Sequence, residues 1–467
     1  HMEVSKKSRR TIFGVLLCAC MVASMVQTAL STALPPIMEE MGLAMSTVQW
    51  LNSSYSLVMG TMILATAWLI KRFPARPLFL IFQSIFTVGL LVSALAGSFV
   101  PLLLGRILQA VGCGLLMSLT QVIILTIYPA NERGSIMGIY GLAVSGAPVL
   151  APTLAGIIID LAGWRAIFWI CLVLSIAILA GGVYAVKNTT ETEPSKLDLL
   201  SFLLCAVGFF GITNGLGNTA SAPLLSLSVG GSLALGGIAL ILFALRQNKL
   251  ETPFIQLAIF RNYEFRTAVI ASMILYCGMM AVSTLLPVYV QSIRGFKATV
   301  SGLVTLPGSL ATALVSPVAG KLYDKLGIQK LYIIGSLFIV VGHFSMFLMG
   351  ESTPLILVGA FFVIRQIGTG ALMMTTVTWG MSRLEAKYTS DGTALISSLR
   401  TIAGAVGAAL FSAIMTAAAK GSEPAGMIVG TRTAFLGITA VSALLLLIAF
   451  GIIRHERQIV KAQGTDG

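Results

Sequence analysis

The sequence predicts an α-helical membrane protein that crosses the bilayer many times. Of its 467 residues, 57% are hydrophobic and only 10% are charged, and the mean hydropathy is +0.94. A soluble domain would carry roughly a quarter charged residues. Long apolar runs recur at lengths that match the ~20 residues needed to span a bilayer. The six cysteines all fall inside such runs, where buried small hydrophobes are expected, and none has metal-ligand spacing.

Fourteen apolar segments are long enough to be membrane-spanning helices. In chain order they lie at roughly 11–37, 47–70, 77–98, 101–127, 135–160, 164–186, 198–219, 224–246, 267–290, 299–321, 329–350, 354–380, 391–418 and 428–453.

The distribution of basic residues tests this count, because cytoplasmic loops collect Lys and Arg. With the N-terminus in the cytoplasm, 22 of the 30 Lys and Arg residues fall on the cytoplasmic side and 5 on the other. The remaining three, Arg106, Arg365 and Arg400, lie inside spans. We therefore expect fourteen helices in a bacterial plasma (inner) membrane, with both termini cytoplasmic. The net charge of +13 then reflects loops that face anionic lipid, and no nucleic-acid partner is expected.

The chain contains two related halves. The segment ATAWLIKRFPARPLFL, around the loop after the second span, is similar to SPVAGKLYDKLGIQKLYI about 253 residues later. In the fourth span, Gly112, Gly114 and Met117 fall on Gly368, Gly370 and Met373 at an offset of about 256. Constant offsets indicate duplicated bundles of six helices in parallel orientation.

The seventh and eighth spans are surplus to this duplication and are expected to form an inserted helix pair between the bundles. We therefore divide the chain into an N-terminal six-helix bundle (1–190), the inserted pair with its linkers (191–255), a C-terminal six-helix bundle (256–455) and a cytoplasmic tail (456–467).

The fifth span has the most unusual composition. It contains Pro148 and Pro152 together with Gly146 and Gly156, and almost every other residue before Asp160 is small or apolar. In a membrane, neighbouring helices can satisfy the carbonyls that proline frees, and small residues let another helix approach closely. One interpretation is a bent, tightly packed helix. The other is a moving contact between the two halves.

Several motifs recur in one known family. They are Ala147-Pro148, Ala151-Pro152 and Ala155-Gly156 in the fifth span, followed by Trp164, Arg165 and Phe168; Gln49, Trp50 and Tyr55 in the second; Arg106, Gln109 and Gly112 in the fourth; and Gly320, Leu322, Asp324 and Gly327 in the loop of the second half. Together they resemble the major facilitator superfamily, in its fourteen-helix drug:proton antiporter branch. The resemblance covers essentially the whole chain. It implies a secondary transporter that works by alternating access.

The chain departs from this branch in two places. The loop signature has decayed in the first half, where Ala67, Lys71 and Pro74 replace its glycine, aspartate and second glycine. The family's aspartate belongs to a cytoplasmic charge latch, so the resemblance implies a different or weaker latch here. The first span also lacks the aspartate that the branch usually carries near Val26 and Gln27.

No carboxylate occupies the middle of any span, since all seventeen acids lie in loops, termini or span ends. An exporter of cationic drugs normally needs one there, because a buried carboxylate can hold a proton or neutralise the drug. The candidates for proton coupling are therefore His343 within a span and Glu39, Glu40 and Asp160 at the outer ends. His343 could equally be a hydrogen-bonded packing residue.

Polar, aromatic and methionine side chains inside spans are candidates for lining a substrate cavity. They are Gln27, Asn52, Tyr55, Gln121, Tyr276, Arg365, Gln366, Met373 and Arg400. The alternative is that they bond between helices or pack. For Arg106 the favoured interpretation is a bond to backbone carbonyls of a neighbouring helix, and Arg400 could reach the cytoplasmic surface. Helix counting puts Arg365 near the midplane, too deep for that.

The sequence thus predicts a secondary transporter that exports hydrophobic or amphipathic small molecules. The family resemblance adds that export is coupled to proton antiport. Alternatives are an uncoupled facilitator and a transport-silent sensor or scaffold. No nucleotide-binding loop or catalytic motif is present, so neither an enzyme nor an ATP-driven pump is expected, and no cofactor or metal is implied. The partners expected are a small-molecule substrate, protons and lipid, with the protein a monomer. Because the interior charges are arginines, we expect neutral, zwitterionic or anionic substrates to be preferred, with Arg365 the main contributor.

Overall fold

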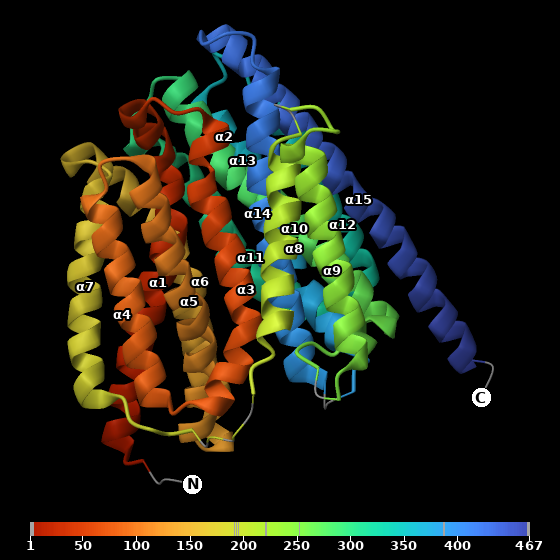
Figure 1. Ribbon diagram of the computed structural model, residues 1–467. Helices are drawn as coiled ribbons and strands as arrows, with labels where there is room; N and C mark the ends of the chain where they lie inside the picture. Colours follow the sequence, from red (N-terminus) through yellow and green to blue (C-terminus); the bar gives the residue numbers. More distant parts are fainter. Residues whose placement is uncertain are drawn as a thin grey trace.

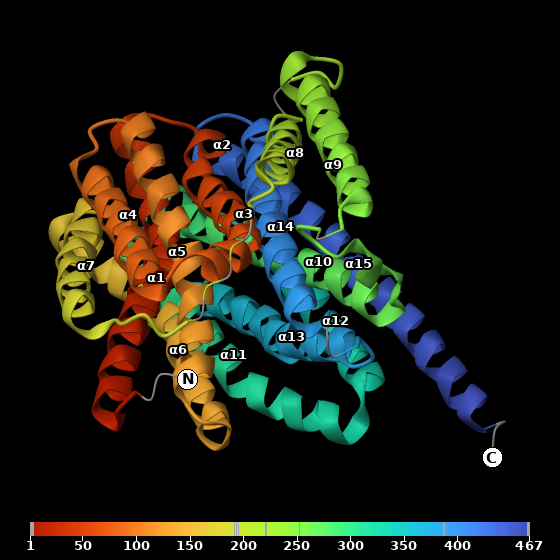
Figure 2. The ribbon, with the colours of Figure 1, turned by 60° about the horizontal axis from the view of Figure 1, so that its bottom comes forward.

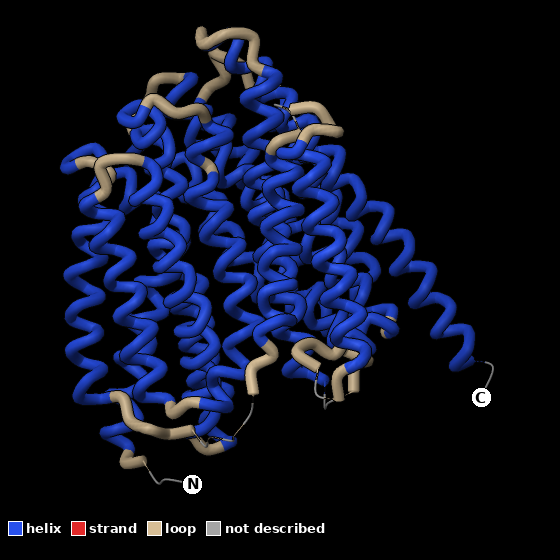
Figure 3. The backbone as a smooth tube through the Cα atoms, in the orientation of Figure 1, coloured by secondary structure: helices blue, strands red, loops and turns tan. Residues whose placement is uncertain are grey.

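The computed structural model describes residues 4–464, except 191, 193, 195, 220, 221, 252, 386 and 387. Within helices, the side chains of 67, 125, 130, 131, 133–135, 137, 138, 141, 142, 145, 146, 389 and 390 also lie outside the description. The described part is helical and contains no strand (Figure 3).

The first half of the chain forms seven helices, of which one is a single short turn. They are α1 (Lys6–Met41), α2 (Met45–Val48), α3 (Trp50–Arg72), α4 (Ala75–Leu95), α5 (Phe99–Ile127), α6 (Ala130–Ala162) and α7 (Arg165–Ala185). Helix α4 packs against α5 and α7, and α1 packs against α6 and α7. In Figure 1 this group occupies the left of the molecule.

The second half repeats this organisation. Its elements are η2 (Leu257–Arg261), α10 (Tyr263–Pro287), η3 (Val288–Ile293), α11 (Ala298–Leu326), α12 (Ile328–Phe347), α13 (Leu355–Met381), α14 (Thr389–Ala418) and α15 (Pro424–Gly464). Between the halves lie α8 (Leu199–Gly217), η1 (Leu227–Gly231) and α9 (Ser232–Lys249). Helices α8 and α9 pack on each other, and α8 also packs on α14 and α3, so the pair lies beside the bundles (Figure 2).

All predicted spans are occupied by helices of at least 18 residues in the described part of the chain. Thirteen of these segments are long and apolar enough to cross a membrane, and α6 contributes a further apolar stretch, Ala147–Ala162. The predicted fold class, a helical membrane protein with two six-helix bundles and an inserted pair, is confirmed. The positions at which we divide the chain into domains stay a prediction. Helix α15 runs eleven residues past the predicted end at 453.

Close contacts between helices confirm that the halves are related by the offsets seen in the sequence. In the first half a Cβ on Gly89 would lie 2.8 Å from the backbone nitrogen of Gln109. In the second half, a Cβ on Gly342 would lie 2.6 Å from the Cβ of Arg365. These two pairs are related by the shifts of 253 and 256 residues found in the sequence. The same helix–helix approach is therefore used twice, and it requires glycine on one side.

An ion pair joins the start of α8 to the end of α9 in the inserted pair. Arg246, near the end of α9, donates to both carboxylate oxygens of Asp198, with Nη2–Oδ1 at 2.9 Å. The pKa of Asp198 is lowered, chiefly by this hydrogen bond. Ser201 also donates to Asp198 and accepts a bond from Gln247, which joins the two helices at the same level.

Both termini lie on the same side of the molecule (Figure 1). We call this the inner side and the opposite one the outer side. In the first half, α1 and α4 run from the inner to the outer side, and α3 and α5 run from the outer side back to the inner side.

Candidate functional site

The two halves meet along three helix pairs: α1 with α10, α3 with α14, and α6 with α11. The contact of α6 with α11 is made by backbone against backbone. A Cβ on Gly156 would lie 2.5 Å from the carbonyl oxygen of Ala298, and a Cβ on Gly302 would lie 2.5 Å from that of Pro152. Thr153 Oγ1 donates to Gly302 O at 3.2 Å. Any larger side chain than glycine at either position would force the helices apart.

One turn further out, an acidic side chain of α6 caps α11. Asp160 Oδ2 accepts from the backbone nitrogen of Thr299 at 2.9 Å and also from its hydroxyl. Thr299 lies in the first turn of α11, where backbone N–H groups lack partners within the helix. A carboxylate there is stabilised by those donors and by the helix dipole. We call the contact formed by Pro152, Thr153, Gly156 and Asp160 with Ala298, Thr299 and Gly302 the outer seam.

The other two helix pairs are joined on the same side. Asn52 of α3 donates to Ser31 of α1 at 3.1 Å and to Thr284 of α10 at 3.4 Å, so it bridges the halves. Gln291 Nε2 donates to the carbonyl of Thr32 at 3.0 Å.

Helices α3 and α14 are bonded further in. Ser53 Oγ donates to Ala405 O at 2.8 Å, and Ser398 Oγ donates to Gly60 O at 2.7 Å. The latter, near the middle of α3, is the innermost bond between the halves among the described residues. All of these bonds between described residues of the two halves lie from the middle of the helices outward.

The prolines that directed attention to the fifth span lie inside α6, which is continuous through Pro148 and Pro152. Ala147, Ala151 and Ala155 are buried, as expected for a closely packed face. Gly146 lies outside the residues whose surroundings are described. The conformational role of Pro148, Pro152 and Gly156 stays a prediction.

Arg106 is fully buried and binds the backbone of two helices. Its Nη1 donates to Val26 O of α1 at 3.3 Å, and its Nε donates to Leu51 O of α3 at 3.4 Å. The guanidinium lies 4.2 Å from the ring centroid of Tyr55 and also donates to Gln109. These are the backbone bonds favoured by the sequence interpretation. Tyr55, a candidate for the substrate cavity, lies beneath this arginine and is 1% exposed.

Arg365 is 2% exposed and belongs to a network inside the second half. Its Nη1 donates to Gln366 Oε1 at 2.5 Å, and its Nε donates to His343 Nε2 at 3.3 Å. Because an arginine can only donate, His343 Nε2 must be unprotonated. Its Nδ1 then carries the proton and donates to Ser442 Oγ at 3.1 Å, while that hydroxyl donates to Thr439 O. His343 is therefore neutral in this arrangement.

Arg400 differs from the other two interior arginines. It is half-buried, with its guanidinium carbon 5.3 Å from the ring centroid of Tyr276 on α10. Among the described residues it makes no hydrogen bond and no ion pair, and its Nε is buried without a partner.

The remaining predicted residues are scattered. Gln27 and Met373 are half-buried, and Gln121, Glu39 and Asp324 are exposed. Glu40 pairs with Arg165 at 2.6 Å within the first half. A Cβ on Gly320 would meet nothing within 4 Å, and Gly327 has a φ of +76°, which favours glycine in the turn between α11 and α12. Asp324 has no ion-pair partner among the described residues. All these site assignments stay predictions.

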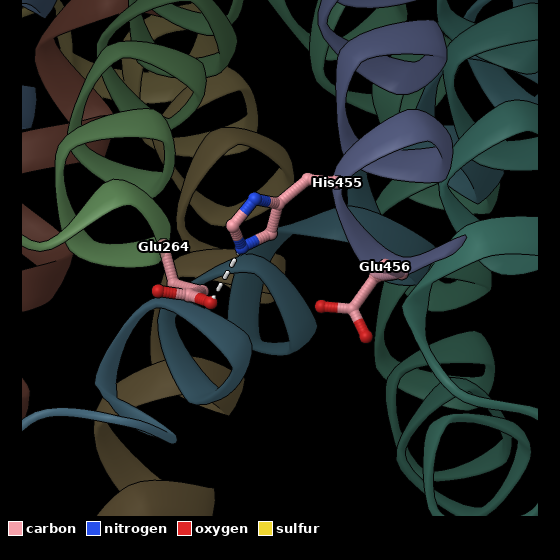
Figure 4. Close-up of side chains that lie close together, drawn as sticks. All are labelled: Glu264, His455 and Glu456. Atoms are coloured by element: carbon pink, nitrogen blue, oxygen red, sulfur yellow. Dashed lines mark hydrogen bonds and ion pairs between the residues drawn. The ribbon is translucent and has the colours of Figure 1, made fainter. Parts of the chain in front are cut away.

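A charged cluster at the inner ends of α10, α13 and α15 was not anticipated. Glu264 Oε1 accepts from Arg383 Nη1 at 2.5 Å and from His455 Nε2 at 2.8 Å (Figure 4). Arg383 also binds Glu456 at 2.8 Å, to which Trp379 Nε1 donates. The pKa of Arg383 is raised, chiefly by its bond to Glu456.

Glu264, His455 and Glu456 have metal-ligand chemistry and lie close together. However, Arg383 already bonds to both carboxylates, so the cluster is best explained as an ion-pair network that joins three helix ends. No sequence signal pairs residues 190 positions apart, which is why the cluster was missed.

Comparisons with known proteins agree with the fold and with the motifs. The profile of the Major Facilitator Superfamily matches residues 16–408. The chain is 33% identical over 460 residues to the MFS-type transporter YcnB of Bacillus subtilis, with 98% of both chains covered. It is 35% identical over 408 residues to the lincomycin resistance protein LmrB of Bacillus subtilis, covering 86% of this chain and 84% of that one.

Among solved structures, the inward-facing, unoccupied form of a bacterial homologue of the human lysosomal transporter Spinster matches with a TM-score of 0.70. The two sequences are 13% identical, and 96% of this chain and 97% of that chain are covered, so the likeness shows the fold. The predicted family resemblance, including the similarity to drug-resistance transporters, is confirmed, and with it the prediction that the protein is not an enzyme. The chain belongs to the Major Facilitator Superfamily and is a multi-pass membrane transporter of small molecules.

Proposed function

We propose that this transporter exports hydrophobic and amphipathic small molecules, drugs among them, from a bacterial cytoplasm by alternating access coupled to proton entry. It acts as a monomer in the plasma (inner) membrane, with both termini and the inner side cytoplasmic. The similarity to the lincomycin resistance protein LmrB supports the substrate class, and the excess of basic residues in the inner loops supports the orientation.

The observation that carries the proposal is the one-sided bonding of the halves. Opening to the outside requires the outer seam to separate, together with the bonds of Asn52, Ser53 and Gln291. The glycines at this contact place backbone against backbone, so few side-chain bonds, those of Thr153 and Asp160, have to break there. The substrate then enters from the inner side in this conformation and leaves through the separated outer seam.

The coupling proton is assigned to His343. A carried proton must be taken up from one side and released to the other, so its site has to lie inside the bundle. Glu39, Glu40 and Asp160 are at the outer end, whereas His343 is buried beside Arg365. Its unprotonated Nε2 fits an inward-facing state that has released its proton inside. Renewed protonation would end the Arg365 bond and put two cations in contact, which favours the other conformation.

The test is uptake into inside-out vesicles that contain the purified, reconstituted protein. Cationic, neutral and anionic amphiphiles are offered with and without an interior-acid pH gradient, beside protein-free vesicles. Accumulation against the concentration gradient only with the pH gradient is expected. Equilibration that ignores the gradient would identify an uncoupled facilitator, and no uptake of any compound would favour a sensor or scaffold.

A further inference from the structure

Arg400 is the one interior arginine that the protein leaves without an acceptor in its described residues. Arg106 donates to backbone carbonyls, and Arg365 donates to His343 and Gln366. Arg400 has only the ring of Tyr276, and its buried Nε has no partner. Buried charges in proteins are normally paired with an opposite charge or an acceptor, because desolvation is costly. An unpaired one in a transporter interior is therefore a position where a ligand can supply the missing partner.

The surroundings of Arg400 lie at mid-depth. Helix α14 spans Thr389–Ala418, so Arg400 lies about 5 Å from its midpoint at 1.5 Å per residue. Its partner Tyr276 lies near the middle of the continuous segment Tyr263–Ile293. A snorkelling arginine would instead be found near a helix end.

The same residues also face the boundary between the halves. Tyr276, Met280 and Thr284 follow one another at four-residue spacing, so they share one face of α10. Thr284 accepts a bond from Asn52 of the other half. Tyr276 therefore lies two turns inward of the outer closure, on the face that meets the first half. Arg400, on α14, packs against this face of α10 through the ring of Tyr276.

The local packing supplies an apolar surface next to the charge. A Cβ on Gly404, one turn from Arg400, would lie 2.7 Å from Met280 Cγ and 3.3 Å from Tyr276 Cδ1. The close approach at Gly404 brings the tyrosine ring and a flexible thioether beside the guanidinium. Such a surface suits an aromatic or aliphatic body of variable shape.

We propose that Arg400, with Tyr276 beneath it, is the specificity-determining residue that binds the single anionic group of an amphiphilic substrate, a sulfonate or carboxylate attached to an apolar body. This rests on the proposed function and names a substrate class for it. A guanidinium forms charge-assisted, bidentate bonds with such groups. This proposal moves the expected origin of charge selectivity from Arg365, whose Nε and Nη1 already donate to His343 and Gln366, to Arg400. Permanent cations are repelled from the same place.

The test uses two fluorescent probes with the same ring system that differ by one sulfonate group: 1-anilinonaphthalene-8-sulfonate and its neutral analogue N-phenyl-1-naphthylamine. Binding of each is measured in lipid nanodiscs for the wild type, Arg400→Gln and Arg400→Lys, with empty nanodiscs as background. The matched control is Arg365→Gln, which removes an interior arginine of similar depth. We expect Arg400→Gln to weaken sulfonate binding about tenfold, the value of one charge-assisted bond, with binding of the neutral probe within about twofold.

The Lys variant should have a sulfonate affinity between those of the wild type and Arg400→Gln, since it keeps the charge but cannot form the bidentate bond. The neutral probe reports whether each variant is folded. A sulfonate-to-neutral affinity ratio that is the same in wild type and Arg400→Gln would overturn the assignment, as would an equal fall of that ratio in Arg365→Gln. If the wild type binds neither probe above empty nanodiscs, the proposed export of amphiphiles fails as well, which separates the two claims.

Discussion

The two halves use the same helix packing but place different chemistry at one equivalent position. In the first half the position is Gln109, a neutral side chain that donates to Gly89 O and Ser93 Oγ. In the second half it is Arg365, which reaches His343 instead. His343 in turn corresponds to Leu90 at the same offset. Duplication has preserved the glycine-dependent approach of the helices, while the polar contents have diverged.

The buried arginines of the two halves differ in the groups that accept their hydrogen bonds. The buried charge of the first half, Arg106, binds backbone carbonyls, which cannot change protonation and move only with their helices. The buried charge of the second half binds an imidazole, which can gain a proton and lose the bond. In the proposed mechanism the first half therefore stays fixed, and the second half contains the residue that responds to protons.

The shared packing gives the largest predicted effect. Gly89→Val and Gly342→Val should each lower the free energy of unfolding by several kcal/mol, about 3 or more, because the added side chain overpacks a backbone contact. Thermal unfolding of the purified variants measures this. Gly237→Val is the matched control, since a Cβ at Gly237 would meet nothing within 4 Å and should cost only the ordinary helix preference. A strong effect at one position and none at its equivalent would break the comparison.

The fixed charge of the first half gives the next effect. Arg106→Gln removes the bonds from a charged donor to the carbonyls of Val26 and Leu51 and should lower the free energy of unfolding by about 2–3 kcal/mol, the range for hydrogen bonds to a charged group. The midpoint of thermal unfolding should fall clearly, at every pH tested. Arg400→Gln serves as the control, because Arg400 makes no such bond. Equal midpoints for the two variants would mean that the Arg106 bonds add nothing to stability.

Making the second half resemble the first should remove proton coupling without unfolding the protein. His343→Leu introduces the residue found at the equivalent position, Leu90, and should abolish the response of transport to a pH gradient while downhill movement persists. His455→Gln, which alters the histidine of the inner charged cluster, is the control and should respond normally. Vesicle uptake with and without the gradient distinguishes them. A full gradient response in His343→Leu would reassign the proton.

The smallest effect is expected at the outer seam. Asp160→Asn keeps a hydrogen-bond acceptor but removes the charge at the start of α11, which should weaken outer closure by about 1 kcal/mol. That corresponds to an about fivefold rise in labelling of a cysteine placed at Phe296, beside the seam, by an outer-side reagent. Glu39→Gln, an exposed acid on the same side, should leave labelling unchanged. Unaltered labelling in Asp160→Asn would show that the cap does not hold the seam.

Much of this architecture could be predicted, because it depends on apolar length, basic-residue asymmetry and repeated glycines. The inserted helix pair of 191–255 could be predicted because two of the fourteen spans are surplus to the duplicated bundles of six. Interactions between distant side chains could not be read in the same way. Arg365 and Arg400 look alike in sequence. Only the packed helices show that Arg365 has hydrogen-bond acceptors and that Arg400 has none among the described residues. The cluster of Glu264, Arg383 and Glu456 depends on three helix ends meeting, which no local pattern encodes.

The central claim is that the two halves rock about contacts that are now closed on the outer side. Spin-label distances in a variant without the six free cysteines test it most directly. One pair is placed at Leu161 and Phe296, beside the outer seam, and another at Arg72 and Lys325, on the inner ends of the two halves. Changing the pH and adding an amphiphile should lengthen the outer distance while the inner distance shortens. Outer and inner distances that stay fixed under all conditions, or that lengthen together, would contradict the account.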